Sequence, residues 1–246
     1  MPTVFDHIAL ATHRIADAPA FLVGELGGIS GYGGPSGDFR WWHWDYRGGG
    51  RIEVIEADGP PGGFVHRYLE RRGPGIHHVN MEIDSLREMC DRAEALGHTV
   101  VGYDDSHEYW HEAFLHPKGA MGLVIQLVAS TDHEHDGEWE HSPATAPEAP
   151  ANPPPTVSIV GLRMRTADRD AALRQWGELL GGEADERPNE LIFRWPGSPM
   201  RVAVTIEPGA ANEAEAIEVR ADRSLTLPTG PHPELGTRFR QVGPNG

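Results

Sequence analysis

Residues 6–12 read DHIALAT, a short alternating stretch in which His7 opens a predicted β-strand. Residues 77–83, HHVNMEI, have the same character and again carry a histidine near their start. Each stretch is followed by a helical segment and then by extended segments joined at glycine-containing turns. The first half of the chain therefore predicts two copies of one β-α-β-β-β module.

The elements of both copies can be assigned from the same signals. In the first copy, IADAPAFLVGELGG predicts a helix, and FRWWHWDY and RIEVIEA predict strands around the turn RGGG. In the second, SLREMCDRAEALGH predicts a helix, and EAFLHP and GLVIQLV predict strands around KGAMG. The segment GGISGYGGPSG has neither a following helix nor a lysine for phosphate binding, so we interpret it as a lid or connector.

The spacing of potential ligands supports the repeat. His7 and Glu53 are 46 positions apart, and His78 and Gln126 are 48 apart. In both copies a histidine on the opening strand is thus matched by a chelating side chain on the closing strand. Two modules that pack together would bring the four residues into one divalent-metal site.

A proline-rich segment divides the chain. Residues 130–155, STDHEHDGEWEHSPATAPEAPANPPP, have almost no aliphatic content and predict an extended linker between a domain at 1–129 and a domain at 156–246. The metal positions are empty in the second half, where His7 falls opposite Gly161, Glu53 opposite about Val204 and His78 opposite about Ala216. It is therefore expected to be a degenerate, metal-free relative, ending in a truncated fourth copy.

Composition narrows the classes of partner. A formal charge of −16 disfavours nucleic acid and anionic membranes, and the chain has no apolar stretch long enough to span a bilayer. A small-molecule substrate and a cytoplasmic location are the expectations. The lone cysteine, Cys90, excludes an intrachain disulfide and a thiolate-rich zinc site. The second domain could brace the first, cover its sheet or form the contact of a homodimer.

Together, DHIALAT, RIEVIEA, PGIHHVNMEID and AFLHPKGAMGLVIQLV resemble the vicinal oxygen chelate superfamily, which includes glyoxalase I, methylmalonyl-CoA epimerase, extradiol dioxygenases and bleomycin resistance proteins. The resemblance covers residues 3–129 well and 156–243 weakly, and it is strongest toward the epimerase and glyoxalase I. It implies an α+β fold of tandem domains, each built of paired βαβββ modules that form a curved, partly open sheet around a cavity.

The resemblance also implies the ligand set His7, Glu53, His78 and Gln126. His78 is chosen over His77 because it aligns with His7. These side chains suit Zn, Ni, Co, Mn or Fe(II). Gln126 departs from the family pattern, in which this position carries glutamate, and an amide cannot act as a base.

The implied activity is that of a metal-dependent epimerase, isomerase or lyase. It would act on a small substrate with chelatable oxygens through an enolate-like intermediate. Glu53 would be both a ligand and a proton carrier, with Glu112 or His111 as the second catalytic group. The alternatives are an extradiol-type dioxygenase and a non-catalytic binder of drugs or natural products, as in the bleomycin resistance branch.

The strand FRWWHWDY supplies the predicted substrate contacts. If Trp44 pairs with Glu53, then Trp42, Trp44 and Tyr46 line the metal cavity, whereas a bulge in the glycines would select His43. The stretch His107–His111, HEYWH, matches the zinc-protease pattern. We reject that interpretation because the stretch is short and lies between predicted strands.

Overall fold

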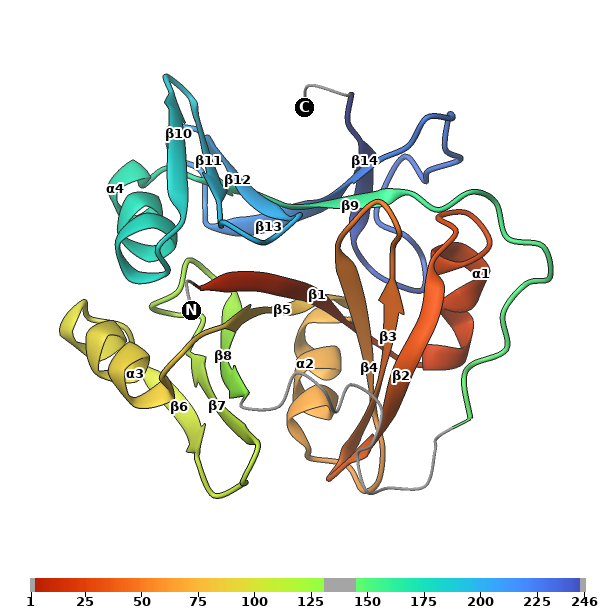
Figure 1. Ribbon diagram of the computed structural model, residues 1–246, viewed down its shortest axis with the longest axis horizontal. Helices are drawn as coiled ribbons and strands as arrows, with labels where there is room; N and C mark the ends of the chain where they lie inside the picture. Colours follow the sequence, from red (N-terminus) through yellow and green to blue (C-terminus); the bar gives the residue numbers. More distant parts are fainter. Residues whose placement is uncertain (1–2, 131–144, 244–246) are drawn as a thin grey trace. The chain divides into compact units, whose positions relative to one another are not determined.

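The computed structural model describes residues 3–130 and 145–243 (Figure 1). The first half contributes eight strands: β1 (Val4–Thr12), β2 (Ile29–Ser36), β3 (Phe39–Asp45), β4 (Arg51–Ala57), β5 (Gly75–Glu82), β6 (Val100–Asp104), β7 (Trp110–Leu115) and β8 (Val124–Ser130). The second half contributes six: β9 (Ser158–Thr166), β10 (Glu183–Arg187), β11 (Glu190–Arg194), β12 (Arg201–Ile206), β13 (Glu213–Arg220) and β14 (Arg238–Gln241). The helices are η1 (Ile15–Asp17), α1 (Pro19–Leu22), α2 (Phe64–Arg72), α3 (Leu86–Ala95), α4 (Arg169–Ala172) and the π-helix η2 (Leu173–Leu179).

The strands form two mixed, open sheets, which confirms the predicted α+β fold of tandem vicinal oxygen chelate type. The strand order is β2-β3-β4-β1-β5-β8-β7-β6 in one sheet and β10-β11-β12-β9-β13-β14 in the other.

One pairing recurs through the chain. The opening strand of each module pairs in parallel with its closing strand: β1 with β4, β5 with β8, and β9 with β12. The last module keeps only this pair, because β13 and β14 also run parallel. The final segment thus has the opening and closing strands expected of a truncated copy.

Local sequence explains where the best-formed helix begins. Ser85 accepts a hydrogen bond from the backbone N–H of Glu88 at 3.4 Å, which caps the first turn of α3. Beyond the last turn, Gly97 adopts a φ of 86°, a conformation that glycine reaches without strain.

Three expectations are corrected. The predicted lid within residues 27–37 is instead strand β2, paired with β3. The predicted helix at residues 15–28 is interrupted, with a 3-10 turn before Pro19 and a short α-helix after it. Helix α2 was not predicted, although Val65, Tyr68 and Leu69 have the spacing of one helical face.

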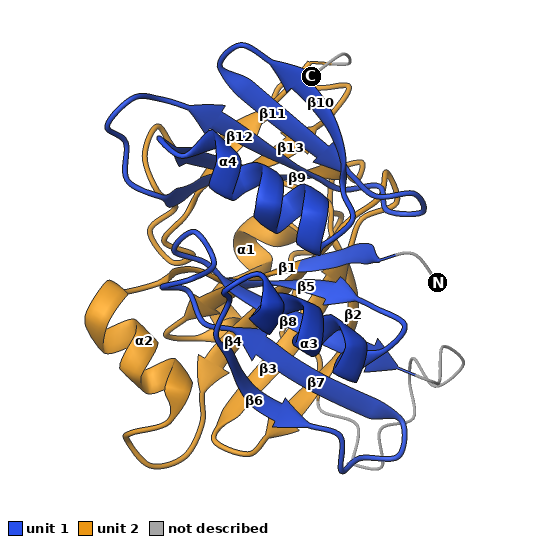
Figure 2. Cartoon of the chain, turned by 90° about the vertical axis from the view of Figure 1, so that its left-hand side faces the viewer, with its two compact units in different colours: residues 1–7, 78–134, 161–215 blue, residues 8–77, 135–160, 216–246 orange. Residues whose placement is uncertain are grey.

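The chain forms two compact units, each made of separate segments (Figure 2). The first comprises residues 1–7, 78–134 and 161–215, and the second comprises 8–77, 135–160 and 216–246. Each unit joins residues from both sides of the predicted linker. In the first, Ser198 donates a hydrogen bond to the carbonyl of Phe5 at 2.6 Å, and in the second Thr12 donates to the carbonyl of Glu234 at 2.9 Å.

Residues 131–144 of the predicted linker lie outside the described residues, and 145–157 contain no helix or strand. Among the described residues, no helix is both long and apolar enough to cross a membrane. The boundaries of the predicted domains at 1–129 and 156–246 stay a prediction.

Candidate metal centre

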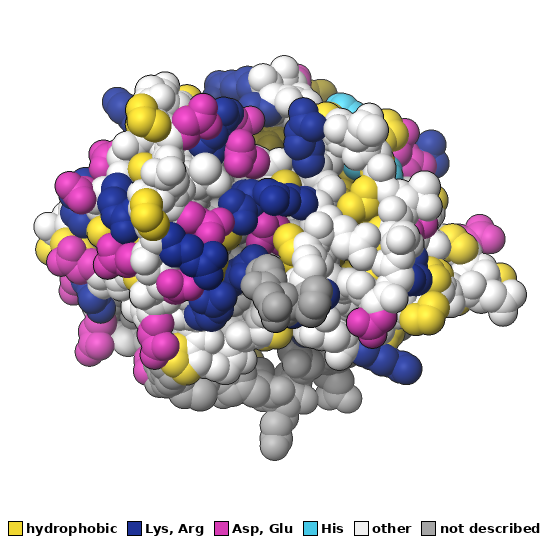
Figure 3. Space-filling view, turned by 90° about the horizontal axis from the view of Figure 1, so that it is seen from above, with side chains coloured by type: hydrophobic (Ala, Val, Ile, Leu, Met, Phe, Trp, Pro, Cys, Tyr) yellow, Lys and Arg dark blue, Asp and Glu magenta, His cyan; other side chains and the backbone are white. Residues whose placement is uncertain are grey.

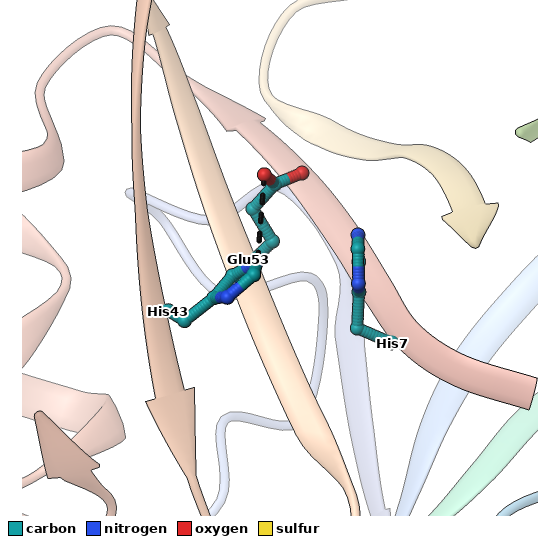
Figure 4. A group of neighbouring side chains, drawn as sticks. All are labelled: His7, His43 and Glu53. Carbon is teal, nitrogen blue, oxygen red and sulfur yellow. Dashed lines mark ion pairs between the residues drawn. The ribbon is translucent and has the colours of Figure 1, made fainter. Parts of the chain in front are cut away.

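Three side chains from three strands form the candidate site. His7 lies on β1, His43 on β3 and Glu53 on β4, and one potential ligand atom from each lies within 4.8 Å of the others (Figure 4). The exposed fractions are 4% for His7, 5% for His43 and 8% for Glu53. Imidazole nitrogens and a carboxylate, buried together, form a donor set that fits a divalent first-row cation.

The strand register explains this convergence. His43 and Glu53 are directly paired across the antiparallel strands β3 and β4, and Nε2 of His43 lies 3.6 Å from Oε1 of Glu53. Glu53 is also the partner of Ala9 on β1. His7 lies two residues before Ala9, so both point to one face of the sheet.

Of the two alternatives for this strand, the structure contradicts the first, because Trp44 pairs with Ile52 and not with Glu53. The turn between β3 and β4 contains Gly49 and Gly50, both at positive φ, and it sets the alternative register in which His43 faces Glu53. A shift of one residue moves every side chain of a strand to the other face.

The predicted substrate residues Trp42, Trp44 and Tyr46 consequently lie on the face opposite His43. All three are buried, and the Tyr46 hydroxyl donates to the carbonyl of Leu22 at 3.4 Å. The indole of Trp42 donates to the hydroxyl of Ser30 at 2.9 Å. This face is part of the packed core. The pairing from which their role in substrate binding was predicted is absent.

Two other aromatic residues lie beside His43. The ring of Tyr32 is 5.1 Å from that of His43, and the ring of Trp41 is 4.9 Å from it. The β2–β3 register shifts between Ser30 and Gly33, which places an additional residue on β2 and turns Tyr32 toward His43. Alternation along FRWWHWDY does place Trp41 with His43, whereas Tyr32 was missed because its segment was not interpreted as a strand.

The imidazole of His7 is oriented by its neighbour. Nδ1 of His7 lies 2.6 Å from a carboxylate oxygen of Asp6. This contact favours the tautomer with the proton on Nδ1, which leaves Nε2 with the lone pair that a metal ion requires.

His78 and Gln126 occupy the matching positions of the second module. His78 lies two residues before Asn80, and Asn80 pairs with Gln126 across β5 and β8. The rings of His78 and His7 are 5.8 Å apart. The structure thus brings these two predicted histidine ligands close together, and it adds His43, which the sequence offered only as an alternative.

His77 has a different environment. Its ring lies 4.8 Å from that of Tyr68 and 5.5 Å from that of Phe64, both on α2. Burial lowers the pKa of His77 to about 4, although the carboxylate of Glu53 acts in the opposite direction. His77 is therefore a neutral residue of an aromatic cluster.

The two proposed second catalytic groups point in opposite directions. Glu112 contacts Gln126, whose Nε2 donates to Oε2 of Glu112 at 2.8 Å. His111 is adjacent on β7 and lines a cavity of about 370 Å³ on the other side of the sheet, with Asp84, Arg87 and Tyr103. His111 is thus not brought to the predicted ligands.

In the second half of the chain, the backbone leaves no room for a side chain at the position that corresponds to the ligand His7. Gly161, aligned with His7, has a φ of 138°, and a Cβ there would lie 1.9 Å from the carbonyl oxygen of Arg201. Nearby side chains form ion pairs, such as Arg163 with Glu190 at 3.0 Å and Arg165 with Glu213 at 2.6 Å. On the surface seen in Figure 3, basic and acidic side chains are likewise interspersed.

Comparison with known proteins agrees with this architecture. The family model for the Glyoxalase/Bleomycin resistance protein/Dioxygenase superfamily matches residues 6–114. No curated protein matches the sequence significantly.

Three solved structures are similar. A hypothetical protein from Staphylococcus aureus is 11% identical, with a TM-score of 0.64 over 98% of this chain and 100% of that chain. A mutant of 4-hydroxymandelate synthase from Streptomyces coelicolor is 16% identical, with a TM-score of 0.59 over 90% of this chain and 72% of that one. Methylmalonyl-CoA epimerase from Mycobacterium tuberculosis is 23% identical, with a TM-score of 0.48 over 52% of this chain and 89% of that one.

The first two of these structures share the fold of this chain, and its residues 6–114 match the model of the Glyoxalase/Bleomycin resistance protein/Dioxygenase superfamily, in agreement with the resemblance of its repeated strands to the vicinal oxygen chelate superfamily.

Proposed function

We propose that this protein is a metal-dependent enzyme of the epimerase, isomerase or lyase type, acting on a small substrate with chelatable oxygens through an enolate-like intermediate. The observation that supports it is the convergence of His7, His43 and Glu53, each less than a tenth exposed, within 4.8 Å. Burying a carboxylate beside two imidazoles is costly unless a partner compensates, and a divalent cation is such a partner.

In this proposal His7, His43 and Glu53 hold the cation, and His78 joins them from the second module. A bound divalent cation would polarise a substrate carbonyl and stabilise negative charge on the neighbouring oxygen. The carboxylate of Asp6 orients the His7 ring through Nδ1. Because Glu53 serves as a ligand, proton transfer is better assigned to a separate carboxylate.

The substrate class follows from the neighbours of His43. Tyr32 and Trp41 are partly exposed, and their rings lie 5.5 Å apart in an edge-to-face arrangement. Such rings bind flat apolar groups well. We therefore propose a substrate that has an unsaturated or aromatic group near its chelating oxygens.

Metal titration tests the ligand set. Protein purified without a metal-affinity tag is expected to bind one divalent ion per chain, and His43→Ala is expected to weaken binding at least about tenfold. His13→Ala, which changes an exposed histidine of the same half, is the matched control. Absence of metal in the purified protein, together with no metal binding on titration, would contradict the proposal.

Isotope exchange tests the reaction. Loaded protein incubated in D₂O with 2-aryl and 2-alkyl acyl thioesters is expected to incorporate deuterium at the α-carbon, faster for the aryl series. A loaded protein that exchanges none of these substrates would count against proton transfer.

A dioxygenase is the second candidate, because two imidazoles and one carboxylate are the donor set of many non-haem Fe(II) oxygenases. The corresponding experiment measures oxygen uptake by the Fe(II)-loaded protein with catechols. Uptake without deuterium exchange would favour this activity over the first.

A further inference from the structure

Gln126 stands where the resemblance implies a carboxylate, and its contacts show what it does instead. Its Oε1 accepts a hydrogen bond from Nδ2 of Asn80 at 2.9 Å, and its Nε2 donates to Oε2 of Glu112 at 2.8 Å. The Trp110 indole donates to the same oxygen at 3.1 Å. The residues Asn80, Gln126, Glu112 and Trp110 form one chain of hydrogen bonds across β5, β8 and β7.

The direction of this chain is fixed by chemistry. An ionised carboxylate only accepts hydrogen bonds, so Gln126 must turn its NH₂ group toward Glu112. Its carbonyl oxygen then faces the NH₂ group of Asn80, which is 1% exposed and has little freedom to rotate. The amide of Gln126 is thus oriented by both neighbours.

The strands bring Glu112 to the side of the sheet that carries His78. Asn80 pairs with Gln126, and Gln126 pairs with Phe114, two residues after Glu112 on β7. Alternation keeps His78 with Asn80 and Phe114 with Glu112. A carboxylate is therefore present on the expected side, one strand away from its usual position.

Both donors, the amide of Gln126 and the indole of Trp110, bind the same oxygen of Glu112. Gln126 and Trp110 hold Oε2, which fixes the plane of the carboxylate and leaves Oε1 as the oxygen that can accept a proton. The charged neighbours on this side are Asp104, directly opposite Glu112 on β6, and Glu82, on β5.

We propose that Glu112 is the proton-transferring carboxylate and that Gln126 is its positioning residue and not a metal ligand. This inference rests on the proposed function. Oε1 of Glu112 takes the α-proton while the electron pair of the C–H bond moves into the enolate, and the same proton or one from solvent returns to the α-carbon. No oxidant or reductant is required.

Two variants separate this role from that of a ligand. In Gln126→Leu, titration with Zn²⁺ or Ni²⁺ alone is expected to give an affinity within about twofold of the wild type, since Gln126 bonds to Asn80 and Glu112 and to none of the proposed ligands. The kcat of deuterium exchange is expected to fall about tenfold with KM unchanged, because the carboxylate is no longer held in place. Gln126→Glu, which keeps the shape but faces Glu112 with a like charge, covers the case in which Gln126→Leu fails to fold.

Two substitutions test Glu112 itself. Glu112→Gln is expected to lower the rate of deuterium exchange about 10²- to 10⁴-fold, and Glu112→Asp, which keeps a carboxylate, should retain part of the wild-type rate. The double variant of Glu112→Gln and Gln126→Leu should be no slower than Glu112→Gln alone, since both act on one group. Glu88→Gln, at an exposed site on α3, is the matched control for the lost charge.

A loss of metal affinity of more than tenfold in Gln126→Leu would make Gln126 a ligand and overturn the inference, as would full exchange by Glu112→Gln. In both cases an active, metal-loaded wild type shows that the proposed function itself stands. A wild type that binds no metal and exchanges no substrate overturns the proposed function and, with it, the role of Glu112.

Discussion

At the scale of single residues, the orientation of His7 depends on the carboxylate before it in the sequence. Adjacent residues in a strand normally point to opposite faces, yet the Asp6 carboxylate reaches Nδ1 of His7 at 2.6 Å. Metal-binding histidines commonly donate their other ring N–H to such a group. The pair DH in DHIALAT therefore combines a ligand with the residue that orients it.

The Asp6–His7 contact predicts a metal-affinity defect in Asp6→Asn. Loss of the charged acceptor should weaken metal binding about 10- to 100-fold while the fold is retained. Competition with a chromophoric chelator measures the affinity directly, and Asp91→Asn, at an exposed site on α3, controls for the change of charge. Equal affinities for Asp6→Asn and the wild type would show that Asp6 does not act on His7.

At the scale of elements, the bulge in β2 depends on glycine. A Cβ at Gly33 would lie 2.2 Å from the carbonyl oxygen of Trp41 and 2.6 Å from the indole of Trp42. At Gly34, the next residue, a Cβ would meet nothing within 4 Å. The close approach of β2 to β3 that turns Tyr32 toward His43 therefore requires glycine at one position and not at the other.

Gly33→Ala is accordingly expected to lower the free energy of unfolding by about 1–3 kcal/mol, whereas Gly34→Ala should change it by less than about 0.5 kcal/mol. Chemical denaturation followed by tryptophan fluorescence gives both values. Similar effects for the two substitutions would contradict the assigned bulge.

Helix α2 is fixed to the strand that follows it by Tyr68. Its hydroxyl donates to the carbonyl of Ile76 at 2.7 Å, and burial raises the pKa of Tyr68 to about 12. In the unfolded chain this pKa is about 10. The folded state thus keeps the proton at pH values where the unfolded state releases it.

Because the folded pKa is the higher one, the contribution of Tyr68 should be fully present below pH 10 and lost as the pH rises toward 12. Tyr68→Phe should cost about 1 kcal/mol at neutral pH through the lost hydrogen bond. The difference between wild type and variant should shrink above pH 10 in urea titrations. A constant difference across this range would disprove the assignment.

At the scale of the whole molecule, the second half of the chain completes both compact units without repeating the metal site. Phe239 packs on Phe21 with ring centroids 4.8 Å apart in one unit, and Thr166 donates to Asn212 at 2.6 Å in the other. Gly161 takes the position of His7 in a conformation that a side chain cannot share. The second half is thus part of the architecture and carries no equivalent of the first ligand.

This arrangement predicts that a metal ligand cannot be introduced at position 161, which corresponds to His7. Gly161→Ala should lower the free energy of unfolding by roughly 3 kcal/mol or more, since both its φ and the nearby Arg201 backbone oppose a Cβ. Gly230→Ala, where a Cβ meets nothing within 4 Å, is the control. A stable Gly161→His variant that binds a second metal ion would refute this explanation.

The sequence alone determined the repeat, the positions of most strands and most of the candidate ligands. Alternation and spacing are local properties, so β4 was predicted with its observed bounds, and His7 and His78 were placed on matching strands. Strand β2 was missed because its glycine-rich segment gives no clear periodicity, and helix α2 was missed although its apolar residues have helical spacing.

Only the tertiary structure decided which residues face the candidate metal. The glycines of the β3–β4 turn shift the register by one residue and replace Trp44 with His43, and the bulge in β2 adds Tyr32. Gln126 is a ligand candidate by position, yet its neighbours on β5 and β7 engage both ends of its amide. Register and cross-strand contacts depend on residues far apart in the chain, and a pattern read along one strand does not contain them.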